Sequence, residues 1–260
     1  MRSATREVII GGNRPTVLTG QRLHSPGKNR LAEARLAQVL GRHDDAIAAL
    51  EEGLAESPDA PALHHALGLA FEERGWTDEA HAAFARAAEL APANPDYQRV
   101  LARYVAAEDL PGAIDALRRL VAAAPDDADA YHQLGLLTLR SGDAEGAIVP
   151  LQRAVRLVPD NPDYHRAVGL CLARLDRTGA IDALKASLAI DPGNAATHAA
   201  LGERLAAEGR FPAALDAYAA AARLAPDDPA HWRALGTLRL AREDTVGAIE
   251  ALTETVRLDP

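Results

Sequence analysis

Hydrophobic residues recur along most of the chain at the spacing of an α-helix. In residues 61–92, Leu67 and Phe71 share one helical face, and Ala80 and Phe84 share another further along. Spacings of three and four residues place side chains on the same side of an α-helix. The pattern therefore predicts two amphipathic helices in this stretch, joined by a short turn.

Prolines divide the chain into segments of nearly constant length. Seven of them recur at almost equal intervals, and each follows an amphipathic stretch: Pro58, Pro92, Pro125, Pro159, Pro192, Pro226 and Pro260. Proline lacks a backbone N–H and clashes with the preceding helical turn, so it ends a helix. Three further prolines lie where first helices should start, a position that tolerates proline: Pro95, Pro162 and Pro229.

Small and large residues recur in register inside each segment. The pair Leu67–Gly68 returns as Leu134–Gly135, Leu201–Gly202 and Leu235–Gly236, with variants at Leu101–Ala102 and Val168–Gly169. Glycine inside a helix costs about 1 kcal/mol relative to alanine, so a recurring glycine indicates the close approach of a second helix. We expect alanines equivalent to Ala80 to be the matching small residues. Large residues equivalent to Phe84 should fill the layer between repeats.

Together these positions resemble the signature of the tetratricopeptide repeat (TPR) family, whose unit is a helix–turn–helix of about 34 residues. The resemblance covers residues 27–260 and implies an all-α fold, a right-handed superhelical α-solenoid of antiparallel helix hairpins. Seven units are expected, at about residues 27–60, 61–94, 95–127, 128–161, 162–194, 195–228 and 229–260. Residues 1–26 fall outside the pattern and are predicted to be an extended or mobile segment. The alternative is that they lie in the groove of the solenoid or on a partner.

Three features depart from the repeat. Glu33 stands where the second unit has Leu67, so the first helix is divergent and is expected to act as a cap. Pro150 lies inside a second helix and predicts a kink or a lost hydrogen bond near Ala147. The last predicted helix has no helix after it, although solenoid ends usually carry a polar cap. Two alternatives are open: the chain is a fragment of a longer protein, or the last helix self-associates or docks on a partner through its apolar residues, Ile249, Leu252 and Val256.

Composition narrows the classes of function. The 260 residues are 48% hydrophobic and 25% charged, the balance of a folded protein. The net charge of −9 argues against a nucleic-acid binder, because phosphate contacts need a basic surface. No apolar run approaches the roughly 20 residues that cross a bilayer, and the start lacks a secretory signal. The expectation is a cytoplasmic protein without membrane insertion, and the scarcity of lysine beside abundant alanine suggests a bacterial source.

Catalytic and cofactor motifs are not found in the sequence. Four histidines recur at a constant interval close to the repeat length, which places each on a different repeat rather than around one metal ion: His132, His165, His198 and His231. We read them as surface positions and expect no metal, cofactor or catalytic residue. Cys171, the one cysteine, is predicted to be a buried core residue. Trp232 is predicted to lie in the core and Trp76 in an exposed or half-buried turn.

The resemblance also implies a binding face, because in TPR proteins the first helices line a concave groove that holds a peptide or a helix. The matching positions here are His65, Leu69, Arg99, Arg103, His132, Leu136, Arg140, Arg166, Leu170, Arg174 and Arg233. Arginine presents forked donors suited to carboxylates, so we expect a partner with acidic residues and a few apolar anchors. The alternative is that these arginines are solvated and pair with helix-start aspartates, namely Asp96, Asp129 and Asp163.

These features predict a non-catalytic scaffold or adaptor that binds a partner peptide or helix in the concave groove. The alternative is a targeting or regulatory region of a larger enzyme, such as a transferase, or of a multi-protein assembly. An enzyme acting on a small molecule or through a metal is disfavoured, because the chain offers no matching motif.

Overall fold

The computed structural model describes residues 26–106 and 109–259. The predicted segment 1–26 therefore lies outside the described residues, except for Pro26, which begins the first helix. The described part is all-α, as predicted, and contains 14 helices. They are α1 (Pro26–Val39), α2 (His43–Glu56), α3 (Pro61–Arg74), α4 (Thr77–Leu90), α5 (Pro95–Val105), α6 (Leu110–Ala123), α7 (Ala128–Arg140), α8 (Ala144–Leu157), α9 (Pro162–Arg174), α10 (Ala180–Ile190), α11 (Ala195–Ala207), α12 (Phe211–Leu224), α13 (Pro229–Ala241) and α14 (Thr245–Leu258).

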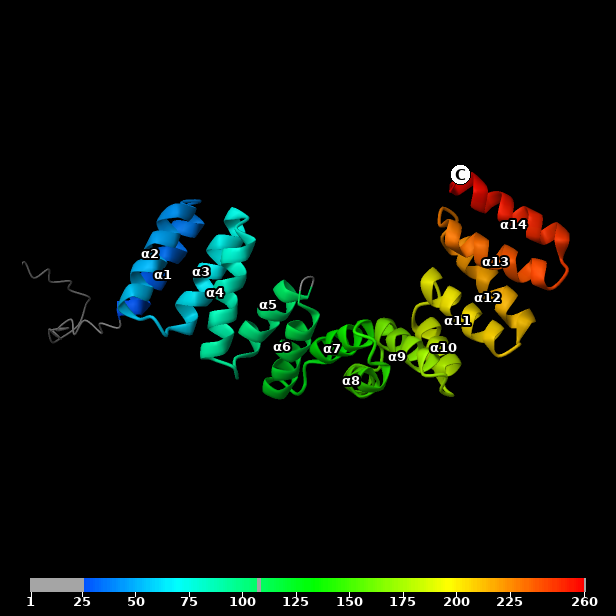
Figure 1. Cartoon of the computed structure of the whole chain (residues 1–260), viewed down its shortest axis with the longest axis horizontal. Coiled ribbons are helices and arrows are strands. Elements are labelled where there is room, and N and C mark those ends of the chain that lie inside the picture. The colour runs from blue at the N-terminus through cyan, green and yellow to red at the C-terminus, as the bar shows by residue number, and fades with distance from the viewer. Residues whose placement is uncertain (1–25, 107–108, 260) are drawn as a thin grey trace, which may run out of the picture.

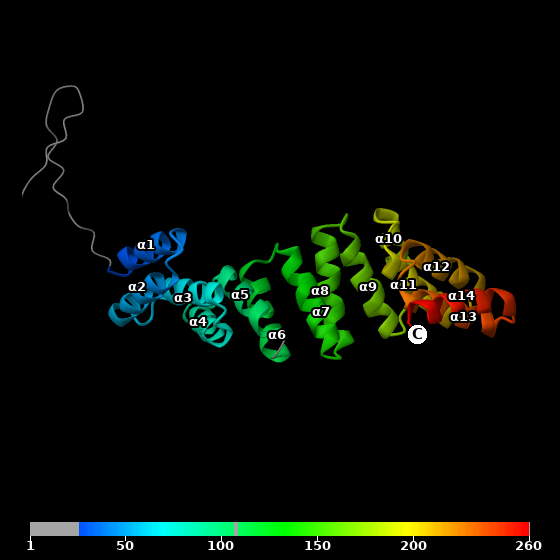
Figure 2. The same ribbon diagram turned by 90° about the horizontal axis from the view of Figure 1, so that it is seen from above.

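Consecutive helices pair into hairpins, and the hairpins follow one another in a single row (Figures 1 and 2). The row is bowed, so that α7 and α8 lie at the bottom of Figure 1 and both ends lie higher. The second helix of each hairpin packs against the first helix of the next one. First helices also contact one another directly, as α7 does with α9 and α9 with α11. The first helices therefore form one continuous layer along the row.

The recurring glycines mark where the two helices of a hairpin come closest. A methyl group added to Gly135 would overlap the side chain of Leu151 and lie 3.3 Å from the carbonyl oxygen of Ala147. On Gly68 it would lie 2.6 Å from the ring of Phe84. The predicted close approach is confirmed, but the glycine faces the large residue of its own hairpin at least as closely as the small one. The large residue also reaches the next hairpin, since the Phe84 ring lies 4.9 Å from that of Tyr104.

Helix ends follow the prolines and their neighbours. Pro95, Pro162 and Pro229 are the first residues of α5, α9 and α13, as predicted. Before two of them, Asn94 and Asn161 accept hydrogen bonds from backbone N–H groups of the first turn. Such caps satisfy donors that the helix leaves unpaired. The second helices end two residues before the repeating prolines, which confirms the helix-ending role assigned to them.

Pro150 does not interrupt its helix. α8 runs from Ala144 to Leu157, and Pro150 is buried within it. Because proline has no backbone N–H, the carbonyl of Gly146 receives no helical hydrogen bond from residue 150. The kink predicted near Ala147 stays a prediction.

Leu134 should carry a large share of the local packing energy, because it is buried between α7 and α6 in an apolar cluster. Leu134→Ala is expected to lower the free energy of unfolding by about 2–5 kcal/mol. Urea unfolding followed by circular dichroism measures this. Leu136→Ala on the same helix is the matched control, since that side chain is exposed. A loss below about 0.5 kcal/mol for Leu134→Ala would mean that the packing register is wrong.

Gly135 tests the close approach itself. Gly135→Ala should destabilise the protein by about 1–3 kcal/mol through overpacking, although alanine favours a helix by about 1 kcal/mol. Adding Leu151→Ala makes room for the new methyl group, so the double variant should be more stable than the sum of the two single losses. The same unfolding assay measures all three variants. A Gly135→Ala protein more stable than the parent would contradict the contact.

Candidate partner-binding face

Every residue predicted for the binding face lies on a first helix. His65, His132, Arg166 and Leu170 are half-buried, and the other predicted residues are exposed. The exposed set is Leu69, Arg99, Arg103, Leu136, Arg140, Arg174 and Arg233. Because the first helices form a continuous layer, these side chains are distributed along one wall of the row rather than gathered into a single pocket.

His65 and His132 each contact a tyrosine ring of the next hairpin, and His65 also contacts Phe84 of its own hairpin. The His65 ring centroid lies 4.9 Å from that of Tyr97 and 5.6 Å from that of Phe84. The His132 ring centroid lies 4.8 Å from that of Tyr164. Burial lowers the pKa of both histidines, because desolvation disfavours the charged ring. Their Nε2 atoms are buried and have no hydrogen-bond partner within the described part of the chain.

Tyr164 is tied to the preceding hairpin through its hydroxyl group, which donates a hydrogen bond to Asp129. Burial, and then this bond to a carboxylate, raises the pKa of Tyr164 above its ordinary range. Asp129 therefore binds a tyrosine. The alternative in which the arginines are solvated expected it to pair with an arginine instead. The contact fixes α9 against α7 beside the His132 ring.

Arg99 and Arg103 on α5 are paired with carboxylates of neighbouring hairpins. Arg99 lies 2.5 Å from Asp127, which caps α7, and 3.3 Å from Asp96 on its own helix. Arg103 lies 3.1 Å from Glu72 at the end of α3. Both side chains remain more than half exposed. These arginines link consecutive first helices while keeping part of each guanidinium group open to solvent.

Arg140 and Arg174 bind the preceding first helix through its backbone. Arg140 donates to the carbonyl oxygen of Ala106, the residue that follows α5. Arg174 donates to the carbonyl oxygen of Leu139 in the last turn of α7, at 3.4 Å. The carbonyls at a helix C-terminus are unpaired and carry partial negative charge, which suits a cation. Arginines on α5, α7 and α9 therefore each connect their hairpin to the previous one along the wall.

Arg166 and Arg233 complete the predicted set. Arg166 lies 2.8 Å from Asp163 on its own helix, and Arg233 is exposed on α13. Two ion pairs, Arg99–Asp96 and Arg166–Asp163, are the pairing with helix-start aspartates that the alternative prediction expected. On this wall, therefore, some arginine side chains form ion pairs within the protein and still remain partly exposed to solvent.

Sequence reasoning missed a motif that spans two repeats. Asn-Pro-Asp-Tyr-X-Arg occurs at residues 94–99 and again at residues 161–166, and the same interval separates His65 from His132. Each copy builds the same arrangement, with a histidine stacked on the tyrosine of the next hairpin. A search for a period of two repeats, rather than one, could have found it.

The ladder of four histidines is a mixture of three positions. His165 and His198 come six residues after a repeating proline, and their Nε2 atoms lie 2.8 and 3.1 Å from its carbonyl oxygen. His132 comes seven residues after its proline and His231 comes five, so neither is equivalent. Trp232 occupies the six-residue position in its hairpin and donates from Nε1 to Pro226. The side chain at this position ties the proline turn to the following helix.

Two of the three remaining predictions for single residues are confirmed. Cys171 is fully buried, its thiol donates to the carbonyl oxygen of Ala144, and burial raises its pKa. A raised thiol pKa disfavours the reactive thiolate. Trp76 is exposed, as expected for a turn residue. Trp232 is half-buried rather than a core residue, because its indole N–H reaches out to the proline turn.

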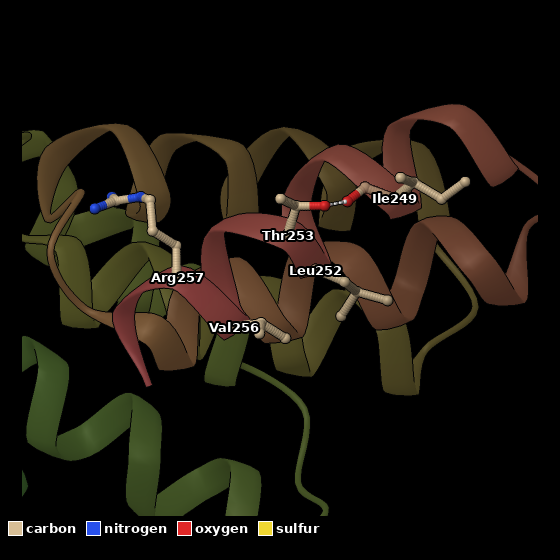
Figure 3. A pocket seen from close by; sticks show the side chains of 5 residues that line it. All are labelled: Ile249, Leu252, Thr253, Val256 and Arg257. Carbon is tan, nitrogen blue, oxygen red and sulfur yellow. Dashed lines mark hydrogen bonds between the residues drawn. The ribbon is translucent and has the colours of Figure 1, made fainter. Parts of the chain in front are cut away.

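None of the described helices combines the length and the apolar character needed to cross a membrane. The described residues also contain no group of three or more metal-ligating side chains. Two hollows lie at the last hairpin. One is a shallow, open surface on α14 alone, formed by Ile249, Leu252, Thr253, Val256 and Arg257 (Figure 3), and the other, of about 650 Å³, lies between α12, α13 and α14.

The half-buried His65 and His132 predict a loss of stability in mild acid. Their pKa is lowered in the folded protein, so below about pH 6.5 the unfolded chain binds more protons than the folded one. The free energy of unfolding should therefore fall as the pH drops below that value. Urea titrations at about pH 7.5 and 5.5 measure the fall. The double variant His65→Asn, His132→Asn should show a smaller fall, and an unchanged pH dependence would contradict this role.

Solved structures share the fold. YrrB, described as a TPR protein with an unusual peptide-binding site, is 20% identical, with a TM-score of 0.60 over 75% of this chain and 97% of that one. PilF of Pseudomonas aeruginosa is 20% identical, with a TM-score of 0.61 over 77% and 92%. The C-terminal part of a TPR repeat-containing protein from Cytophaga hutchinsonii is 15% identical, with a TM-score of 0.69 over 88% and 95%. At these identities the likeness shows the fold alone.

A search of curated proteins finds no match to this chain. Sequence profiles described as tetratricopeptide repeat match residues 37–104 and 172–238, and a second profile of the same description matches residues 102–162 and 134–195. Together the matches cover residues 37–238 without a break, and this range includes the glycines of the helix contacts and the arginines of the wall. The chain belongs to the tetratricopeptide repeat family.

Proposed function

We propose that this protein is a non-catalytic scaffold that binds a segment of a partner protein along the wall of first helices. TPR domains bind proteins and peptides. The observation that carries the proposal is the continuous layer of first helices, which presents exposed arginine and leucine side chains from successive hairpins. The described peptide-binding site of YrrB, a protein of the same fold, supports this use of the fold.

The charge on the wall favours an acidic partner with apolar anchors. Arg99 and Arg103 keep more than half of their side-chain surface exposed although both are ion-paired. A guanidinium group has five N–H donors, so a partner carboxylate can bind beside the internal one. Leu69 and Leu136 are exposed at 37% and 38% and offer shallow apolar contacts two hairpins apart.

Internal pairing sets the strength and the salt dependence of binding. The partner's carboxylates compete with Glu72 and Asp127 for Arg103 and Arg99. Exposed ion pairs contribute about 0–1 kcal/mol each and are screened by salt. A single carboxylate therefore binds weakly, and affinity comes from several contacts made along the wall.

Removing three charges from the wall tests the proposal. An array of leucine-containing peptides with acidic, neutral or basic residues is probed with the parent protein and with the variant Arg99→Gln, Arg103→Gln, Arg166→Gln. Acidic peptides should bind best, and the variant should bind them at least about tenfold more weakly, which corresponds to about 1.4 kcal/mol over three contacts.

The matched control removes three ion-paired arginines from second helices, two exposed and one half-buried as in the first variant: Arg86→Gln, Arg118→Gln, Arg153→Gln. It changes the net charge equally and should keep the parent's affinity. Equal losses in the two triple variants would show that only the overall charge matters. Unchanged binding in the first variant, with intact helicity, would remove the wall as the binding face.

A further inference from the structure

Two stretches of the wall repeat each other, and the second lies two hairpins further along the row. The first copy has Leu69 on α3 and Arg99 on α5, and the second copy has Leu136 on α7 and Arg166 on α9. Leu69 and Leu136 are almost equally exposed, so both copies offer a similar apolar contact. The charged groups around the two arginines can therefore be compared position by position.

The guanidinium group of Arg99 holds two carboxylates at once. It lies 3.3 Å from Asp96 on its own helix and 2.5 Å from Asp127, which caps α7 of the next hairpin. One oxygen of Asp127 accepts from the backbone N–H of Ala130, and the other accepts from Arg99. A guanidinium group has five N–H donors, which is enough for two carboxylates. The first copy thus shows which chemical group fits at the second place beside this arginine.

The second copy lacks the carboxylate of the next hairpin. Asn194 stands where the first copy has Asp127 and caps α11. Its side-chain oxygen accepts from the backbone N–H and the hydroxyl group of Thr197. Asn194 therefore keeps the capping role without the negative charge. Within the described part of the chain, the ion pair of Arg166 is with Asp163 alone, at 2.8 Å.

Arg166 also has a donor that the fold leaves unused. Its Nε atom is buried and has no hydrogen-bond partner among the described residues. A buried donor without a partner is unfavourable. The rest of the side chain reaches solvent, with 32% of its surface exposed. Turning the guanidinium group outward onto a carboxylate would free Nε from this position and supply the second partner that Arg99 already has.

The end of the first helix also differs in charge between the copies. α3 carries Glu72 and Glu73 in its last turn, and the equivalent residues of α7 are Leu139 and Arg140. Arg140 donates to a backbone carbonyl oxygen, whereas Arg103 of the first copy is paired with Glu72. The second copy therefore adds a positive charge where the first copy is acidic, which favours an anion along this stretch.

We propose that a carboxylate of the partner binds Arg166 in the place that Asp127 occupies at Arg99, and that Asn194 keeps this place open. The inference rests on the proposed function, because it names the position on the wall that holds the acidic partner. Leu136 is the apolar contact of the same copy. Arg99 is the weaker position, because a partner carboxylate there competes with Asp127.

Exchanging the two capping residues tests this assignment. Asn194→Asp should place an internal carboxylate beside Arg166 and weaken binding of the best acidic peptide of the array about fivefold, because that carboxylate competes with the partner for an exposed ion pair. Asp127→Asn should open the equivalent place at Arg99 and strengthen binding about threefold. Asparagine and aspartate both cap helices, so both proteins should keep their helicity in circular dichroism. Fluorescence anisotropy with labelled peptide measures the affinities.

The matched control is Asn94→Asp, which adds the same charge at a residue that also caps a first helix. It should change the affinity less than about twofold, because it lies at the first copy. The double variant Asp127→Asn, Asn194→Asp has the net charge of the parent. In that background Arg99→Gln should weaken binding more than Arg166→Gln, which reverses the order expected in the parent.

Each peptide is made with an amidated and with a free C-terminus, which distinguishes side-chain carboxylates from a terminal one. A loss on Asn194→Asp for either kind of peptide supports the assignment and identifies the source of the carboxylate. If no acidic peptide binds the parent, the proposed function fails and this inference fails with it. If acidic peptides bind the parent and the Asn194→Asp protein equally well, or if Arg99→Gln weakens binding to the parent more than Arg166→Gln, this inference alone is overturned.

Discussion

The structure depends on one repeated contact, in which a glycine of a first helix meets a large side chain of the second helix. At Gly135 and Gly169 there is no room for a methyl group beside Leu151 and Leu184. The contact lets the two helices approach closely enough for the large side chain to touch the next hairpin as well. The contact recurs at Gly68, Gly202 and Gly236, and alanine takes the glycine's place at Ala102 of α5, so successive hairpins add to the row in a similar way and the first helices form one wall.

The arginines of the wall both connect hairpins and remain exposed. Arg103 holds Glu72 of the previous hairpin while more than half of its side chain faces solvent. On the wall, the arginines that connect hairpins are therefore also the residues proposed to bind the partner.

Much of this architecture could be predicted from the sequence because the signals are local and repeat. Proline ends a helix wherever it occurs, and spacings of three and four residues indicate a helical face without knowledge of the fold. The predicted hairpins, the role of Pro95 and the burial of Cys171 follow from such signals. The pairings between hairpins could not be predicted in the same way. Arg103 and Glu72 are 31 residues apart, and which carboxylate an arginine reaches depends on the angle between neighbouring hairpins.

The four regularly spaced histidines do not occupy equivalent positions, for a related reason. The repeat length differs slightly from unit to unit, so a fixed interval shifts from one structural position to the next. Among the four histidines of the ladder, His165 and His198 alone share a position, and both contact the carbonyl oxygen of the preceding repeat proline.

The most direct test of the wall as the partner-facing surface is amide hydrogen exchange of the full chain, free and saturated with the best acidic peptide of the array. The account predicts slower exchange in the exposed turns of α3, α5, α7 and α9 when the peptide is bound, with the second helices unchanged. Protection confined to the second helices would contradict it.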